Sequence, residues 1–320
     1  MSDRILLTGG AGFIGSSVLD ALVLRGQRVT VLDEFNPYYD PQLKHENVEA
    51  AIASGLADVR NADIVDPQTW ADLDPDEGWA AVIHLAARAG VRPSIQDPAL
   101  YARTNVVGTT RVFDWATSGD APIPVVYASS SSVYGDAYPV PFAEDAAPLG
   151  PVSPYGATKE ACEALARTWQ RMRGLPVVGL RFFTVYGPRQ RPDLAIHKFA
   201  RKIDAGEAIP VYGDGTSARD YTHVQDITAG VLAATDRLID GALEHAIYNL
   251  GSDRAIRLDA MIAAIEQAVG KPAIIDRQPD QLGDVKRTWA DITRARQGLG
   301  YAPSITFEDG LMDFVAWLRR

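Results

Sequence analysis

A tyrosine and a lysine four residues apart, Tyr155 and Lys159, carry the clearest chemistry in the sequence. Residues at this spacing share one face of a helix. Ser153 can cap such a helix and Pro154 suits its first turn, so we predict that a helix begins here. A lysine ammonium near a phenol stabilises the phenolate, which can then act as a base near neutral pH. Alone, the pair also fits a surface tyrosine beside a solvated lysine, so the other motifs decide its meaning.

A glycine-rich stretch near the N-terminus has the pattern of a dinucleotide-binding turn. Residues 4–7 predict a strand and residues 13–24 a helix, and glycines spaced by three join them. These glycines, Gly9, Gly12 and Gly15, allow a tight turn, a close approach of the backbone to a pyrophosphate, and close packing of helix on strand. The N-terminus of the helix would then face the phosphates.

The second predicted strand, residues 28–32, is followed by Asp33, at the spacing of a carboxylate that binds a ribose. A carboxylate in this place would repel a 2′-phosphate, so the predicted cofactor is NAD rather than NADP. The alternative is that Asp33 only forms the turn before Asn36 and Pro37.

Strands and helices alternate through the first half of the chain, which predicts an α/β fold with a Rossmann-type, doubly wound parallel sheet. The further strands are predicted at residues 56–59, 80–85, 124–128 and 177–182. Ligands of such sheets bind beyond the carboxyl ends of the strands. Each glycine-rich or polar cluster directly follows a predicted strand, so we expect the clusters to meet in one crevice.

Beyond residue 182 the pattern indicates a smaller α/β domain that binds the substrate. Residues 1–182 and about 223–250 are predicted to form the cofactor-binding domain, and residues 183–222 and 251–320 the smaller one. Within it, residues 184–193 are rich in Gly, Pro and Arg and are predicted to be a long loop.

Composition and charge restrict the possible partners. The chain has 320 residues, a net charge of −10 and no basic block, which argues against nucleic acid and anionic membranes. Its single cysteine, Cys162, excludes an internal disulfide, and five scattered histidines give no metal-binding spacing. We find no signal peptide and no apolar run of transmembrane length, so we expect a cytoplasmic protein without a metal site.

Five motifs in series resemble those of the extended short-chain dehydrogenase/reductase family, in the branch that acts on nucleotide sugars. They are Thr8-Gly9-x-x-Gly12-x-x-Gly15, His84-Leu85-Ala86-Ala87, the serine run ending in Val133-Tyr134-Gly135, Tyr155-x3-Lys159 and Arg181-Phe182-Phe183. Within this branch the sequence is most similar to the epimerases of UDP-glucuronate, in residues 33–40, 89–92, 129–135, 183–188 and 283–291. One departure is Leu282, where a proline is usual.

This resemblance implies an NAD-dependent isomerase that inverts C4 of UDP-glucuronate to give UDP-galacturonate. Tyr155 would take the proton of the sugar 4-hydroxyl while hydride passes from C4 to tightly held NAD⁺. Lys159 would assist the tyrosine and bind the nicotinamide ribose, and Ser130 would bridge the hydroxyl and the tyrosine. The 4-keto sugar would then rotate and take the hydride back on its other face, without net redox change.

The resemblance also implies the binding residues. Those for the cofactor are Gly9, Gly12, Phe13, Ile14, Gly15, Asp33, Asn36, Asp63, Ile64, Leu85, Ala86, Ala87, Tyr155 and Lys159. For UDP, Arg219 matches the arginine that binds the diphosphate and Asp284 the residue that accepts from the uridine ribose, with Arg92 and Arg287 as further candidates. Asn105 is expected to make a structural hydrogen bond beneath the nicotinamide. Residues 98–116 and 155–173 resemble the helices of the family's dimer interface, so a homodimer is expected.

The residues after Ser130 separate this sequence from sister enzymes. Sugar dehydratases of the family carry Asp-Glu there, and decarboxylases of UDP-glucuronate usually carry a Glu second, but here the residues are Ser131 and Ser132. Hydroxyls can bind a carboxylate without adding negative charge. We expect Ser131, Ser132 and Thr184, with Arg191 nearby, to hold the uronate carboxylate so that it resists loss of CO₂. The alternative is that the serines only satisfy backbone groups at the strand end.

Three other functions remain open on the sequence. The first is a C4 epimerase of neutral or N-acetylated UDP-hexoses, and the second is a decarboxylase. The third is a protein that binds NAD without catalysis, although such a protein has no need of an activated phenol.

Overall fold

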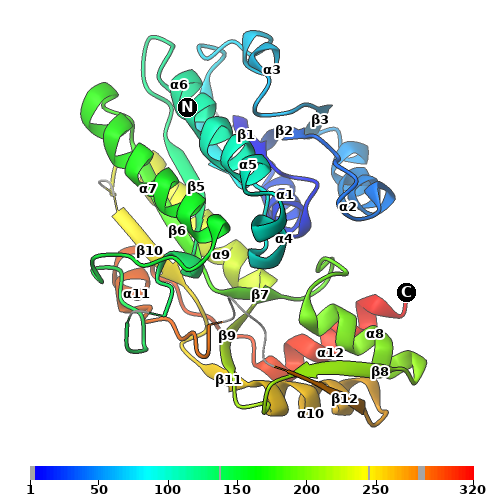
Figure 1. Ribbon diagram of the computed structural model, residues 1–320. Helices are drawn as coiled ribbons and strands as arrows, with labels where there is room; N and C mark the ends of the chain where they lie inside the picture. The colour runs from blue at the N-terminus through cyan, green and yellow to red at the C-terminus, as the bar shows by residue number, and fades with distance from the viewer. Residues whose placement is uncertain (1–3, 137, 244–245, 280–284) are drawn as a thin grey trace.

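The computed structural model describes residues 4–136, 138–243, 246–279 and 285–320 (Figure 1). Its largest element is a seven-stranded, all-parallel sheet in the order β10-β6-β5-β4-β1-β2-β3. The strands are β1 (Arg4–Thr8), β2 (Arg28–Asp33), β3 (Ala57–Asn61), β4 (Trp79–His84), β5 (Val125–Ser130), β6 (Val177–Phe182) and β10 (Ala246–Leu250). The direction of winding reverses between β1 and β4, where ligands of such sheets bind. The predicted doubly wound parallel sheet is confirmed.

Helices cover both faces of this sheet, because successive side chains of a strand point to opposite sides. Ile5 and Leu7 of β1 belong to one apolar core and Leu6 to another, and all three are fully buried. The first core is covered by α1 (Phe13–Leu24), α2 (Pro41–Ala53), α9 (Val224–Ile239) and α11 (Thr293–Leu299). The second is covered by α3 (Pro67–Ala71), α6 (Gly108–Ala116) and α7 (Pro154–Arg173). Burial on both faces explains why a central strand such as β1 is a continuous apolar run.

The helix predicted over residues 98–116 contains a π-helical segment. After α4 (Val91–Gln96), the chain forms α5 (Pro98–Tyr101), a π turn at Ala102–Val107, and then α6. Within the π turn, Asn105 accepts from the Arg88 N–H at 2.8 Å and donates to the Arg88 carbonyl at 3.0 Å and the Thr158 hydroxyl at 2.9 Å. The expected structural hydrogen bonding of Asn105 is confirmed, and π turns are frequent at functional sites.

A smaller lobe lies beside the carboxyl ends of the sheet strands (Figure 1). Its three-stranded sheet has the order β11-β9-β7, and β8 and β12 form a parallel pair. Its elements are β7 (Thr184–Tyr186), α8 (Ala195–Ala205), β8 (Ala208–Tyr212), β9 (Ala218–His223), β11 (Ala255–Arg257), α10 (Leu258–Val269), β12 (Ile274–Gln278) and α12 (Phe307–Leu318). The lobe has its own apolar core, which includes Phe199, Met261 and Phe314.

Two features of the C-terminal half differ from the pattern-based reading. Residues 184–193, predicted to be a loop, begin with β7, a three-residue strand that pairs with β9 and is too short to show periodicity. Residues Ala295, Leu299 and Tyr301 pack into the core of the large sheet rather than into the lobe. Where the two predicted domains divide stays a prediction. No helix among the described residues is long and apolar enough to cross a membrane.

Candidate active site

A cavity of about 450 Å³ opens at the carboxyl ends of the sheet strands. It is lined by residues at the ends of β1, β2, β4, β5 and β6, by the start of α7, and by the segment after β7. All the residues predicted to bind the cofactor line it, namely Gly9, Gly12, Phe13, Ile14, Gly15, Asp33, Asn36, Asp63, Ile64, Leu85, Ala86, Ala87, Tyr155 and Lys159. The crevice expected from the sequence is therefore present, and clusters far apart in the chain meet in it.

The glycine turn is shaped so that no side chain would fit at Gly9 or Gly15. Gly9 has a φ of +74°, and a Cβ on it would lie 2.6 Å from the backbone nitrogen of Ala86. A Cβ on Gly15 would lie 2.0 Å from the Gly9 carbonyl oxygen, so only glycine lets α1 pack this closely on the turn. Among the described residues no side chain caps the N-terminus of α1, which begins after Gly12. A helix N-terminus of this kind offers backbone N–H donors to an anion, which fits a pyrophosphate.

Asp33 lies at the end of β2 and is 8% exposed. Its carboxylate accepts from the Phe35 N–H at 3.0 Å and from the Ala11 N–H at 3.1 Å. It therefore stabilises a local turn, as the alternative reading required, and it also faces the cavity. The two readings are compatible, because one carboxylate can accept several hydrogen bonds.

The helix of Tyr155 begins as predicted. The Ser153 hydroxyl accepts from the Gly156 N–H at 3.1 Å, and Pro154 is the first helical residue. The Tyr155 N–H donates to the hydroxyl of the buried Ser94 at 3.1 Å, which connects α7 to α4. The Tyr155 ring packs edge-on against Tyr101 with centroids 6.3 Å apart. The start of α7 is thus held from several sides.

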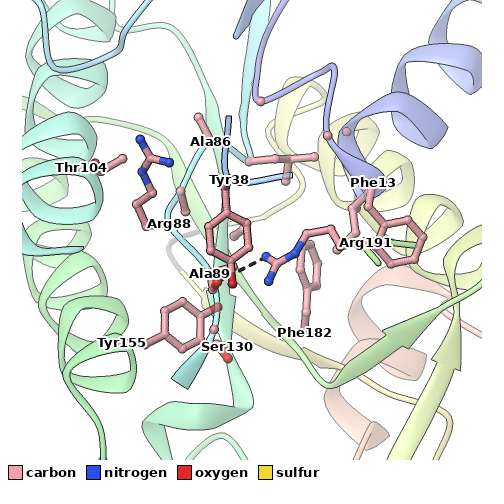
Figure 2. Close-up of a pocket in the computed structure, with 18 of the residues that line it drawn as sticks. Phe13, Tyr38, Ala86, Arg88, Ala89, Thr104, Ser130, Tyr155, Phe182 and Arg191 are labelled. Atoms are coloured by element: carbon pink, nitrogen blue, oxygen red, sulfur yellow. Dashed lines mark hydrogen bonds between the residues drawn. The ribbon is translucent and has the colours of Figure 1, made fainter. Parts of the chain in front are cut away.

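The three residues predicted to be catalytic, Tyr155, Lys159 and Ser130, all line the cavity. Lys159 is 5% exposed, and its ammonium donates to the Ala128 carbonyl on β5 at 2.9 Å. Ser130, two residues after Ala128, is the last residue of β5, and its hydroxyl accepts from the Ser132 N–H at 3.2 Å. Figure 2 shows Tyr155 and Ser130 pointing into the cavity from α7 and β5. A phenol, an ammonium and a hydroxyl placed in this way can move a proton to and from a substrate hydroxyl.

Three further hydroxyls line the same cavity, those of Ser131, Ser132 and Thr184. In the part of the chain that the structure describes, none of these hydroxyls has a hydrogen-bond partner. The backbone N–H of Ser132, just beyond the strand end, donates instead to the hydroxyl of Ser130. This speaks against the reading in which Ser131 and Ser132 only satisfy backbone groups, because their hydroxyls remain available to a ligand.

Arg191 reaches the cavity, but its guanidinium is already engaged (Figure 2). It donates to both oxygens of Asp193, at 2.9 and 2.7 Å, and to the Ala89 carbonyl at 3.3 Å. Burial alone would raise the pKa of Asp193, but the hydrogen bonds from Arg191 lower it below the ordinary value. Tyr38 completes the cluster, since its hydroxyl donates to Asp193 at 3.2 Å and its ring lies 5.1 Å from the guanidinium carbon.

Of the residues predicted to bind UDP, the three that the structure describes, Arg92, Arg219 and Arg287, do not line this cavity. Arg92 lies over the Tyr212 ring of the smaller lobe, at 5.3 Å. Arg219 donates to the Ala218 and Lys286 carbonyls, at 2.9 and 3.3 Å. Arg287 is brought next to Ala218 by an isolated bridge, so Arg219 and Arg287 come from adjoining segments. Asp284 and Leu282 lie outside the described residues. The assignment of these side chains to UDP stays a prediction.

Sequence reasoning missed several residues of the cavity. Glu34 and Arg88 form an ion pair of 3.0 Å between the segments that follow β2 and β4. Tyr38 and Tyr101 also line the cavity and were not singled out. The only signal for Tyr38 was its place in the segment after Asp33, because its partners come from distant parts of the chain.

Comparisons with known proteins agree with this geometry. Residues 5–251 match the model of the NAD dependent epimerase/dehydratase family. The chain is 38% identical to UDP-glucuronate 4-epimerase 3 of Arabidopsis thaliana, covering 98% of this chain and 76% of the relative. It is 37% identical to UDP-glucuronate 4-epimerase of Thermodesulfobacterium geofontis, covering 98% of this chain and 95% of the relative.

The structure of UDP-glucuronic acid 4-epimerase from Bacillus cereus, in complex with UDP-glucuronic acid and NAD, is similar with a TM-score of 0.90 at 31% identity, over 99% of each chain. UDP-glucose 4-epimerase from Thermotoga maritima gives 0.88 at 29% identity, over 99% of this chain and 98% of that one.

Proposed function

Because the chain belongs to the NAD dependent epimerase/dehydratase family, we propose that it inverts C4 of UDP-glucuronate to give UDP-galacturonate. The observation that carries this proposal is that two sets of residues line the same cavity. Tyr155, Lys159 and Ser130 supply the proton-transfer groups, and Ser131, Ser132 and Thr184 supply further hydroxyls in the same cavity. Two relatives matched along 98% of this chain, from Arabidopsis thaliana and Thermodesulfobacterium geofontis, are named UDP-glucuronate 4-epimerases.

The cavity fits NAD. Gly9 and Gly15 allow the turn to close tightly, and a pyrophosphate would lie against the first turn of α1. Asp33 would accept from the hydroxyls of the adenosine ribose, and its charge disfavours a 2′-phosphate. When bound, NAD supplies the group that takes a hydride from the sugar carbon and returns it.

The proton transfer is assigned to Tyr155. As phenolate it would accept the proton of the sugar 4-hydroxyl and later return it to the oxygen of the inverted sugar. The Lys159 ammonium, which donates to the Ala128 carbonyl of β5, would stabilise the negative charge that develops on the tyrosine. Ser130, at the end of the same strand, would hydrogen-bond the reacting hydroxyl and keep it near the phenol oxygen.

The specificity for a uronate is assigned to the hydroxyls of Ser131, Ser132 and Thr184. Hydrogen bonds from hydroxyls are stronger when the acceptor is charged, and the hydroxyls add no negative charge of their own. A carboxylate bound by several donors cannot turn freely, which would keep the 4-keto uronate from the alignment that loses CO₂. Neither Ser131 nor Ser132 can supply the acid and base that a dehydratase needs at neutral pH.

The proposal extends to the smaller lobe and to assembly. Arg219, with Arg92 and Arg287, would bind the diphosphate, and Asp284 would accept from the uridine ribose. A homodimer would form through the helical segment that includes α5 and α6 together with α7. The exposed apolar side chains of Leu100, Val107 and Met172 on these helices support such an interface. Light scattering on the purified protein tests it, since a monomer mass would contradict the assembly.

Parallel incubations test the function. The enzyme is given NAD⁺ with UDP-glucuronate in one reaction and with UDP-galactose in the other, and the products are identified by mass and NMR. UDP-galacturonate formed faster than UDP-glucose, without accumulation of NADH, is the expected result. A pentose product would instead indicate a decarboxylase, a faster reaction of UDP-galactose a neutral-sugar epimerase, and no product in either reaction a binding protein.

A further inference from the structure

A buried ion pair joins the helix of Tyr155 and Lys159 to the central sheet. Glu163 of α7 is 0% exposed and Arg181 of β6 is 3% exposed. The guanidinium meets the carboxylate in two parallel hydrogen bonds, from Nε to Oε1 and from Nη2 to Oε2, each of 2.8 Å. This two-pronged geometry fixes the orientation of both side chains as well as their distance.

Glu163 also holds the carboxyl end of β5. The hydroxyl of Ser129, which is 2% exposed, donates to Glu163 Oε1 at 2.6 Å. One helical turn earlier, Lys159 donates to the Ala128 carbonyl. Lys159 and Glu163 therefore bind two consecutive residues of β5, and the next residue of that strand is Ser130. These bonds fix the position of α7 along β5, and therefore its position relative to Ser130.

Arg181 is held in turn by its own surroundings. Its guanidinium carbon lies 4.6 Å from the centre of the Tyr134 ring, and β5 and β6 pair Arg181 directly with Ser129. Burial by itself would lower the pKa of Arg181, but the hydrogen bonds with Glu163 raise it above its ordinary value. The guanidinium therefore stays charged, and Glu163 keeps a cationic partner from the sheet.

Stability alone does not account for such a pair. Removing two charges from water is costly, and apolar residues of similar size often replace a buried ion pair without loss of stability. A second consequence is electrostatic, because Glu163 follows Lys159 by one turn on the same buried face. With both oxygens engaged by Arg181 and Ser129, Glu163 does not compete with the phenolate of Tyr155 for the Lys159 ammonium.

We propose that Glu163 and Arg181 are positioning residues that set the placement of Tyr155 and Lys159 relative to Ser130. The kinetic consequence rests on the proposed function. Without the pair, α7 shifts against the end of β5, and the phenol moves away from the reacting hydroxyl. The turnover number falls, whereas the KM for the sugar nucleotide, which depends on other elements, changes little. A misplacement of about 1 Å is expected to cost roughly 100-fold in rate.

The first test is the apolar double variant Glu163→Leu/Arg181→Met. We expect its melting temperature to stay within about 5 °C of the wild type. We expect kcat to fall roughly 100-fold with a change in KM below about threefold. A stable double variant with the kcat of the wild type would overturn the proposal.

Ser129→Ala serves as a second, milder variant, since a change in a buried pair can prevent folding. It removes only the hydroxyl that donates to Glu163, and kcat should fall roughly fivefold. Added to Glu163→Gln, it should cause little further loss, because the two side chains act through the same contact. A Ser129→Ala enzyme with unchanged kcat, or losses that simply multiply in the double variant, would contradict the proposal.

Crystal structures of the wild type and the double variant give a readout that does not depend on activity. The separation of the Tyr155 and Ser130 oxygens should change by about 1 Å or more, and an unchanged separation would overturn the positioning role. A wild type that fails to interconvert the uronates while the variant shows this displacement would overturn the proposed function alone.

Discussion

The guanidinium of Arg191 is paired with the carboxylate of Asp193, through hydrogen bonds of 2.9 and 2.7 Å at the wall of the cavity. Arg191 was expected to hold the substrate carboxylate together with the nearby hydroxyls. In the structure the guanidinium fork that would bind a uronate is occupied by Asp193. A substrate carboxylate would therefore have to compete with Asp193 for Arg191.

The first prediction follows from this competition. Asp193→Asn removes the charge of the competitor and should lower the KM for UDP-glucuronate roughly three- to tenfold, because hydrogen bonds to charged groups are among the strong ones. The KM for UDP-galactose, which has no carboxylate, should not change. Steady-state kinetics with both sugars check this, with Asp204→Asn as control, since it removes an ion-paired carboxylate of α8 that does not line the cavity. Equal changes in KM for the two sugars would show that Arg191 does not bind the substrate carboxylate.

The second prediction concerns the hydroxyls beside Ser130. Ser132→Glu places a negative charge where the uronate carboxylate is proposed to lie, and its repulsion should raise the KM for UDP-glucuronate at least about tenfold. Ser132→Ala is the matched control, since it removes the hydroxyl without adding charge, and its effect should be several-fold smaller. The ratio of the kcat/KM values for UDP-glucuronate and UDP-galactose is the measurement. If Ser132→Glu epimerises UDP-glucuronate with an unchanged preference, the carboxylate lies elsewhere.

The third prediction concerns the choice of cofactor. Asp33→Asn keeps a side-chain oxygen that can accept from the Phe35 N–H but removes the negative charge at the end of β2. Affinity for NAD⁺ should fall roughly tenfold, and discrimination against NADP⁺ should weaken. Calorimetric titration with both nucleotides measures this. Asp40→Asn, at the exposed cap of α2, controls for the loss of a carboxylate outside the cavity. An unchanged ratio of the two affinities would show that Asp33 serves only its turn.

The fourth prediction concerns the dependence of stability on pH. His84 lies between the hydroxyls of Thr8 and Thr109, at 2.7 and 3.0 Å, and burial together with the nearby Lys159 lowers its pKa to about 3. The unfolded chain binds a proton there below about pH 6.5, whereas the folded protein does not. This group should therefore destabilise the fold progressively as the pH falls from about 6.5 towards 3, by about 1.4 kcal/mol per pH unit.

Denaturant unfolding of wild type and His84→Gln between pH 7 and pH 4.5 isolates this contribution. His197 and His223, whose pKa values are also lowered by burial, contribute with the same sign in both proteins and cancel in the difference. The free energies of unfolding should approach each other as the pH falls. Parallel curves would mean that His84 is not held neutral in the fold.

Local sequence determined much of this structure. The start of α7 at Ser153 and Pro154 follows from capping preferences that act within a few residues, and the structure agrees. The placement of Gly9 and Gly15 follows from steric limits that belong to the turn itself. Strands such as β1 could be predicted because burial on both faces favours a continuous apolar run, here Ile5 to Leu7.

Features that depend on tertiary partners could not be read in this way. The pairing of Arg191 with Asp193 and Tyr38, and of Glu163 with Arg181, joins residues whose neighbours come from other elements. The π-helical segment around Asn105 looks like ordinary helix in the sequence, and Asn105 makes hydrogen bonds to the backbone of Arg88, outside the helix. The strand β7 is stabilised by β9 rather than by its own three residues.

The most direct test of the account is the turnover of Tyr155→Phe. This change removes one oxygen from the cavity and leaves the ring that packs against Tyr101. With NAD⁺ binding and melting temperature close to those of the wild type, we predict that interconversion of UDP-glucuronate and UDP-galacturonate slows by roughly 100- to 10,000-fold. Interconversion at the rate of the wild type would contradict the claim that the Tyr155 oxygen moves the proton.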